Sequence, residues 1–103
     1  MSAPRAFVYM ISNKSRTLYC GIATDLRKRF EQHRNGTYEN GFTARYHFTR
    51  LVWFEAAASL AEAARREKQI KGWPRKRKVA LIQAMNPHWI DLSPRLDPLY
   101  WFA

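Results

Sequence analysis

Hydrophobic and polar positions near the start of the chain predict a β-hairpin. Residues 7–12 and 18–23 are rich in β-branched and aromatic side chains, and a polar, turn-forming segment separates them. Two short strands around such a segment are typical of a hairpin. If the chain folds back about residues 14 and 15, Tyr9 and Tyr19 come to lie close together on adjacent strands.

The pattern then changes to the spacing of an amphipathic helix over residues 26–33. Thr24 or Asp25 can cap this helix, because both side chains accept a hydrogen bond from the first free backbone N–H groups. Arg29 and His33 are four residues apart, so they share a neighbouring face of the predicted helix.

The rest of the chain predicts a third strand and two more helices. Residues 36–49 are polar yet aromatic and are expected to form a long loop, followed by an apolar strand over residues 51–54. A capping box at Ser59 begins a second helix that runs to residue 72, and a third helix follows from Pro74 to about residue 85. The order strand, strand, helix, strand, helix, helix predicts an α+β fold, a small three-stranded antiparallel sheet flanked by three helices.

Helical spacing also predicts which side chains of the last two helices face the core. In the second helix the expected apolar stripe consists of Leu60, Ala63, Ala64 and Ile70. In the third helix it consists of Val79, Ile82 and Met85.

Length and composition indicate a single globular domain. The chain has 103 residues, of which 47% are apolar, enough for one modest core. We expect the core to extend over about residues 6–92 and an irregular tail to follow over residues 93–103. The single cysteine, Cys20, cannot form an intramolecular disulfide. Because no stretch is long enough for a signal peptide or a membrane span, a cytoplasmic location without membrane contact is expected.

The charge is the unusual property of this composition. Eighteen Lys and Arg face eight Asp and Glu, which gives a formal net charge of +10. A surplus of this size favours a polyanionic partner, and nucleic acid is the usual one. The alternative is a solvated basic surface that only keeps the protein soluble. The residues expected to contact nucleic acid are Arg27, Arg45, Tyr46, Lys68, Lys71, Arg75 and Lys76.

Glu67 is the most informative acidic residue. It falls at helical spacing on the predicted apolar stripe of the second helix. A carboxylate that faces a core is costly unless a cation or a hydrogen-bond network receives it. One interpretation is therefore a salt bridge to one of the arginines. The other is a ligand for a divalent metal ion of the Mg²⁺ type, which prefers oxygen ligands.

The order of these residues resembles the GIY-YIG nuclease family, and in particular its small stand-alone bacterial branch. Each piece has an ordinary structural explanation by itself, and the resemblance rests on all of them in sequence, from residue 7 to about residue 92. The matching pieces are Val8-Tyr9, Tyr19-Cys20-Gly21, Asp25-Leu26 with Arg29 and His33, residues 42–46, residues 51–55, Arg66-Glu67-Lys68 and Asn86-Pro87. Phe7 and Cys20 stand where the family name has its first glycine and second isoleucine, and Ile22 stands where some relatives carry a lysine.

The resemblance implies a divalent-metal-dependent endonuclease that hydrolyses phosphodiester bonds, with DNA favoured over RNA and little sequence specificity. It implies Mg²⁺ or Mn²⁺ as the cofactor, held by Glu67. Tyr19 would act as the base or position the water, assisted by Tyr9. Arg29 would donate to the phosphate oxygens, and His33 would orient a tyrosine or contact the phosphate.

The resemblance also matches Asn86 to a late asparagine of the family.

Two other functions are consistent with the same sequence. One is a nucleic-acid-binding module that keeps the fold without the chemistry, and the other is an interaction domain for an acidic protein. An ordered set of tyrosine, arginine and glutamate is not needed by an interaction domain, which favours the nuclease.

Overall fold

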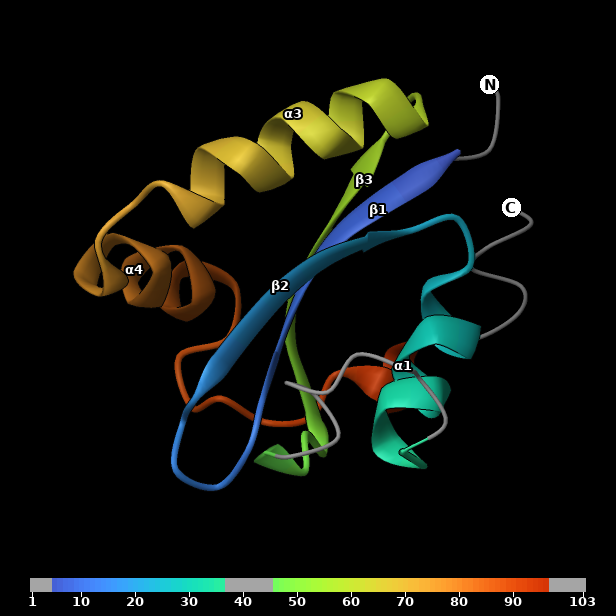
Figure 1. The fold of residues 1–103 in the computed structure, drawn as a ribbon. Helices are drawn as coiled ribbons and strands as arrows, with labels where there is room; N and C mark the ends of the chain where they lie inside the picture. Colours follow the sequence, from blue (N-terminus) through green and yellow to red (C-terminus); the bar gives the residue numbers. More distant parts are fainter. Residues whose placement is uncertain (1–4, 37–45, 97–103) are drawn as a thin grey trace.

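The computed structural model, which describes residues 5–36 and 46–96, contains one antiparallel sheet (Figure 1). Its strands are β1 (Ala6–Ser12), β2 (Leu18–Ala23) and β3 (Arg50–Ala57), in the order β2-β1-β3. Every residue of β1 is buried because this strand is central in the sheet. The three predicted strands are confirmed, and β3 is longer than the predicted range of 51–54.

Helices cover both faces of this sheet. They are α1 (Leu26–Arg34), α3 (Leu60–Lys71) and α4 (Arg75–Met85). In Figure 1, α3 and α4 lie on one side of the strands and α1 lies on the other. Asp25 caps α1 by accepting from the backbone N–H of Lys28, and Ser59 caps α3 by accepting from the N–H of Glu62. The α+β class and the predicted order of elements are therefore confirmed.

Alternation along β1 divides the core into two clusters. Val8 and Met10 face the α3 side, whereas Tyr9 and Ile11 face the α1 side. On the α3 side the cluster includes the buried side chains of Ala63, Ile70, Ile82 and Trp89. On the α1 side it includes Leu26, Phe30, Phe48, Leu51, Leu92 and Leu96. Successive residues of one strand thus reach opposite sides of the molecule.

The predicted apolar stripes of α3 and α4 are too wide. Ala63 and Ile70 are buried as expected, but Leu60 is 51% exposed and Ala64 is also exposed. Met85, at the end of α4, is 45% exposed. In α4, Ile82 is buried and Val79 packs against the same core cluster, as predicted. A three-stranded sheet offers a narrow surface, so the outer residues of both predicted stripes remain exposed.

Packing continues beyond the predicted end of the core at residue 92. Ser93–Arg95 forms a short 3-10 helix, and Leu96 is buried in the cluster on the α1 side. The backbone N–H of Leu92 donates to the carbonyl of Leu51 at 2.8 Å, which joins this segment to β3. Residues 97–103 of the predicted tail lie outside the described residues. No helix within the two described ranges has the length and apolar character of a membrane span.

Candidate active site

The hairpin brings Tyr9 and Tyr19 to the same side of the sheet. Tyr9 pairs with Gly21, and Ile11 pairs with Tyr19, so the two tyrosines are diagonal neighbours on β1 and β2. Their ring centroids are 6.4 Å apart, with an angle of 49° between the ring planes. The predicted proximity of the two rings is confirmed, and it results from a turn about residues 14 and 15.

Gly21 makes this arrangement possible. A Cβ atom at this position would lie 2.6 Å from the Tyr9 hydroxyl oxygen, 2.8 Å from Tyr9 Cζ and 3.0 Å from Tyr19 Cε1. The Tyr9 side chain therefore lies over the backbone of β2 in space that any other residue would fill. A glycine is therefore required at position 21, because the ring of Tyr9 on the neighbouring strand occupies the space of a Cβ atom.

His33 from α1 lies beside both tyrosines. Its Nε2 and the Tyr9 hydroxyl are 2.7 Å apart in a buried hydrogen bond whose direction depends on the tautomer. The ring centroid of His33 is 5.2 Å from that of Tyr19. Burial, and secondly the nearby Arg29 guanidinium, lower the pKa of His33 from 6.5 to about 4. The imidazole is therefore neutral at neutral pH and carries one nitrogen lone pair.

Arg29 lies one turn before His33 on α1. Its Nη1 donates to the carbonyl of Ile22 on β2 at 3.4 Å, so the guanidinium is directed toward the edge strand. After burial, its positive charge is the second cause of the lowered pKa of His33. The expected common face of Arg29 and His33 is consistent with both observations.

Two charged residues of α3 approach β2 from the other side of the sheet. Nζ of Lys71 lies 3.5 Å from Oε1 of Glu67 and 5.9 Å from the ring centroid of Tyr19. Glu67 also acts on the thiol of Cys20, the next residue of β2. The pKa of Cys20 is raised from 9.0 to about 11, first by burial and then by the charge of Glu67, while the charge of Lys71 opposes the shift.

The side chains described above form the cluster of the candidate site, namely Tyr9, Tyr19, Arg29, His33, Glu67 and Lys71. This cluster has members on both faces of the sheet, and they meet at the edge strand β2. Tyr9, His33 and Arg29 belong to the α1 side, whereas Glu67 and Lys71 belong to the α3 side. Lys71 of α3 contacts the ring of Tyr19, which lies on this edge strand. Side-chain contacts thus form a continuous path from Tyr9 through His33, Tyr19 and Lys71 to Glu67.

The carboxylate of Glu67 provides oxygen atoms of the kind that a hard divalent cation prefers as ligands. The described part of the chain contains no group of three or more His, Cys, Asp or Glu side chains that could hold a metal ion. Mg²⁺ needs no such cage, because it is usually held by one or two carboxylates together with waters and substrate phosphates. The side chain of Glu67 is 22% exposed, and its ion pair is with Lys71 of its own helix rather than with an arginine.

Asn86 has a structural role at the end of α4. Its Nδ2 donates to the carbonyls of Val52 and Ile90, at 3.2 and 2.8 Å, and its Oδ1 accepts from the N–H of Ile90 at 3.1 Å. The buried amide is thus used in holding the chain after α4 against β3. The structure does not bring Asn86 into the contact path of the cluster.

The predicted nucleic-acid-binding residues are distributed over several surfaces. Arg27 is exposed on α1 near Glu31, and Lys68 lines an open groove on α3 with Arg65, Arg66 and Gln69. Lys76 is exposed at the start of α4, while Arg75 donates to the carbonyl of Arg16 at 2.7 Å and joins α4 to the hairpin turn. Tyr46 is half-buried, and Arg45 lies outside the described residues.

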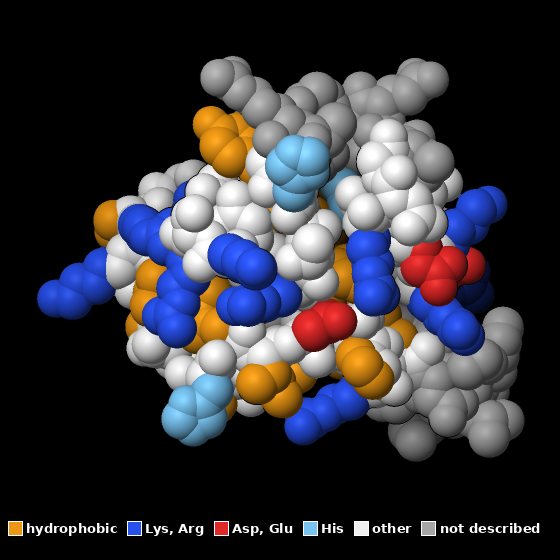
Figure 2. Space-filling model, turned by 90° about the horizontal axis from the view of Figure 1, so that it is seen from below, with side chains coloured by type: hydrophobic (Ala, Val, Ile, Leu, Met, Phe, Trp, Pro, Cys, Tyr) orange, Lys and Arg blue, Asp and Glu red, His pale blue; other side chains and the backbone are white. Residues whose placement is uncertain are grey.

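Basic side chains predominate on the face seen in Figure 2. Lys and Arg side chains extend across the middle and left of that view, with few acidic side chains among them. Figure 2 is turned from Figure 1 about the horizontal axis, so its left side is the side of α4. This distribution matches the expectation of a polyanionic partner.

Sequence reasoning missed two features of the cluster. The sequence indicates Gly21 only as part of a motif, and a glycine within a strand was the available signal for a close approach. Lys71 was expected to bind nucleic acid, and its contacts with Tyr19 and Glu67 were not anticipated. Its position four residues after Glu67 was the available signal for the ion pair.

The chain is similar to a known domain family and to known proteins. A model of the GIY-YIG catalytic domain matches residues 5–80. A UPF0213 protein of Syntrophus aciditrophicus is 35% identical over 81 residues, covering 79% of this chain and 92% of that protein. A UPF0213 protein of Vibrio cholerae is 34% identical over 80 residues, covering 77% of this chain and 78% of that protein.

A solved structure is also similar. The solution NMR structure of a UPF0213 protein from Bacillus halodurans matches with a TM-score of 0.53 and 30% sequence identity. The match covers 82% of this chain and 88% of that chain. The similarity therefore extends over most of both molecules.

Proposed function

Since this chain belongs to the GIY-YIG family, a nuclease superfamily, we propose that it is a divalent-metal-dependent endonuclease that hydrolyses phosphodiester bonds in DNA. The observation that carries the proposal is the contact path across β2. It joins two phenols and a neutral imidazole on one side to a carboxylate on the other. A buried core has no need of this combination of groups.

We assign to Tyr19 the activation or positioning of the attacking water. It lies between the imidazole of His33, at 5.2 Å between ring centroids, and the ammonium of Lys71, at 5.9 Å from its ring. A phenol is a weak base unless nearby positive charge favours the phenolate. Lys71 places such a charge 5.9 Å from the ring centroid. Tyr19 would accept a proton from water as the phenolate, or hold the water for attack as the phenol.

Tyr9 and His33 form the rigid support of this group. The neutral His33 accepts a hydrogen bond from the Tyr9 hydroxyl at Nε2 in the tautomer that we assign to the active protein. Both side chains are buried, so this pair defines the position of the Tyr19 ring that packs beside it. We assign a positioning role to the pair, and we assign to Arg29 the stabilisation of charge on the non-bridging phosphate oxygens.

Glu67 would hold the metal ion, since it is the carboxylate of the cluster and is partly open to solvent. A bound Mg²⁺ or Mn²⁺ supplies Lewis-acid polarisation of the phosphate and stabilisation of the departing oxygen. The ammonium of Lys71 is paired with the same carboxylate and would have to leave it. It would then be available to the phenol of Tyr19 or to the phosphate.

Metal-dependent cleavage of a DNA duplex and of a single strand is the direct test. We expect cleavage with Mg²⁺ or Mn²⁺ and none with EDTA. Tyr19→Phe should bind DNA in EDTA with wild-type affinity but cut it on the order of 10²-fold or more slowly, because only the hydroxyl is lost. Binding without metal-dependent cleavage by the wild type would contradict the nuclease and indicate a binding module instead.

A further inference from the structure

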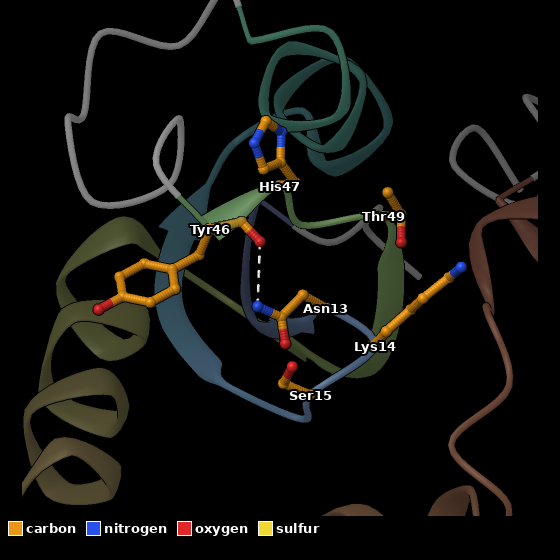
Figure 3. A pocket seen from close by; sticks show the side chains of 6 residues that line it. All are labelled: Asn13, Lys14, Ser15, Tyr46, His47 and Thr49. Carbon is orange, nitrogen blue, oxygen red and sulfur yellow. Dashed lines mark hydrogen bonds between the residues drawn. The ribbon is translucent and has the colours of Figure 1, made fainter.

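We propose that a second phosphate-binding site lies at the tip of the hairpin, in the pocket between the β1–β2 turn and residues 46–49 (Figure 3). It would hold a backbone phosphate of the nucleic-acid strand that enters the candidate active site. This inference rests on the proposed function, since it takes nucleic acid as the substrate. The pocket has a volume of about 280 Å³ and is lined by Asn13, Lys14, Ser15, Tyr46, His47 and Thr49.

The two walls of the pocket are held together by hydrogen bonds. Nδ2 of Asn13 donates to the backbone carbonyl of Tyr46 at 3.0 Å, which is the dashed line in Figure 3. Its Oδ1 accepts from the N–H of Thr17 at 3.0 Å, which closes the turn. On the other side, the N–H of Thr49 donates to the carbonyl of Ser12 at 3.2 Å. The pocket is thus organised without a ligand.

The polar groups around the pocket are those that bind phosphate oxygens. Lys14 provides an ammonium, Ser15 and Thr49 provide hydroxyls, and all three side chains are exposed. In Figure 3, Lys14 of the turn and Thr49 of the other wall lie on the right of the view, and Tyr46 lies on the left. No carboxylate is among the lining residues. Lysine, serine, threonine and asparagine side chains make many of the known contacts to nucleic-acid phosphates.

The size of the pocket favours a backbone unit over a whole nucleotide. Sites for small molecules usually enclose roughly 300–1,000 Å³, and this pocket is at or below that range and opens to solvent. A phosphate with its sugar needs little enclosure, because its charge is recognised by a few donors. A site of this kind fixes the position of the protein along the nucleic-acid strand and has no sequence preference.

An aromatic row connects the pocket to Tyr19. The ring of Tyr46 lies 6.3 Å from that of Phe48, and the ring of Phe48 lies 6.2 Å from that of Tyr19, all between centroids. The hairpin that ends at Lys14 also carries both tyrosines of the cluster. A phosphate in the pocket would therefore be held at a defined distance from the scissile phosphate, which would determine where on the strand the cut occurs.

Loss of one charge from the pocket is the first test. A labelled 12-nucleotide single strand is titrated with protein in EDTA, where no cleavage occurs, at several salt concentrations. Lys14→Gln should weaken binding and reduce the slope of log affinity against log salt by about one, because one phosphate contact is lost. The matched control is Arg5→Gln, which removes one positive charge at the opposite end of β1 and should leave the slope unchanged. Equal slopes for both variants would overturn the site.

Direct detection with inorganic phosphate is the second test. In a titration followed by NMR, the backbone amides of Lys14, Ser15 and Thr49 should shift with a common affinity, and Thr49→Val should weaken it. Shifts that spread over the basic residues of α4 without these amides would overturn the site. Neither test requires cleavage. A protein that shows the Lys14 effect but never cuts would contradict the nuclease alone, and one that cuts with equal slopes would contradict the pocket alone.

Discussion

The two sides of β2 differ in how their functional groups are held. On the α1 side, Tyr9 and His33 are 0% and 2% exposed, and a 2.7 Å hydrogen bond joins them. On the α3 side, the side chains of Lys71 and Glu67 are 51% and 22% exposed, and their ion pair is 3.5 Å long. One half of the cluster is built by packing, and the other is a pair of charges that water and ligands can reach.

This difference predicts how stability and activity separate. A buried hydrogen-bonded pair contributes to folding, and its loss leaves an unsatisfied polar group in the core. An exposed ion pair contributes about 0–1 kcal/mol to stability, because water screens it and long side chains lose freedom. Changes on the α1 side should therefore affect both fold and cleavage, and changes on the α3 side should affect cleavage alone.

The largest expected effect is on the α3 side. Glu67→Gln removes the charge that would hold the metal, so we expect cleavage to fall by about 10²-fold or more with little change in melting temperature. Glu55→Gln is the matched control, because Glu55 is also ion-paired, with Arg66 at 3.0 Å, but lies on β3 outside the cluster. Cleavage rates and thermal unfolding of both variants are compared. Full activity of Glu67→Gln would contradict the role of the carboxylate.

On the α1 side, Gly21→Ala should reduce stability and cleavage together. The added methyl group would overlap the Tyr9 phenol, and overpacking of this kind costs about 1–3 kcal/mol. Gly72→Ala is the control, because a Cβ there meets its nearest atom at an ordinary 3.5 Å. Urea unfolding measures the free energy of each variant. Wild-type stability and activity of Gly21→Ala would show that the close approach of Tyr9 is not required.

A pH effect on stability should also come from the α1 side. His33 has a pKa of about 4 in the folded protein against 6.5 as its ordinary value. Between these values the unfolded chain binds a proton that the folded chain does not, so stability falls as the pH decreases from 6.5 to 4. Over this range His33 should lower the free energy of unfolding by about 3 kcal/mol. Urea unfolding across this range should show a shallower pH dependence for His33→Gln, and equal slopes would contradict the buried neutral imidazole.

The smallest effect on stability is expected for Lys71→Met. Loss of its exposed ion pair should change the free energy of unfolding by less than about 1 kcal/mol. Removal of the competing ammonium should tighten Mn²⁺ binding by at most about fivefold, as measured by electron paramagnetic resonance. Arg65→Met, on the same helix, should leave Mn²⁺ affinity unchanged. Weaker Mn²⁺ binding by Lys71→Met would contradict competition for Glu67.

Much of the fold could be predicted from local patterns. Runs of β-branched and aromatic residues identified the strands, and helical spacing identified the helices. Thr24 or Asp25 and, for the next helix, Ser59 marked two helix starts, and the structure selects Asp25 for the first and confirms Ser59 for the second. The proximity of Tyr9 and Tyr19 followed from the short turn between their strands. The exposure of Leu60 and Met85 could not be predicted, because it depends on the width of the sheet beneath each helix.

The sequence by itself determined the elements, the excess of positive charge and the resemblance to a nuclease family, since these depend on residue types and on short spacings. Only the tertiary structure decided that β2 is an edge strand, that Lys71 of α3 contacts the Tyr19 ring of this strand, and that Glu67 is joined to Tyr19 through Lys71. It also assigned the amide of Asn86 to the backbone of β3 and the post-α4 chain. Strand order and contacts between distant segments arise from packing of the whole chain, and no local pattern encodes them.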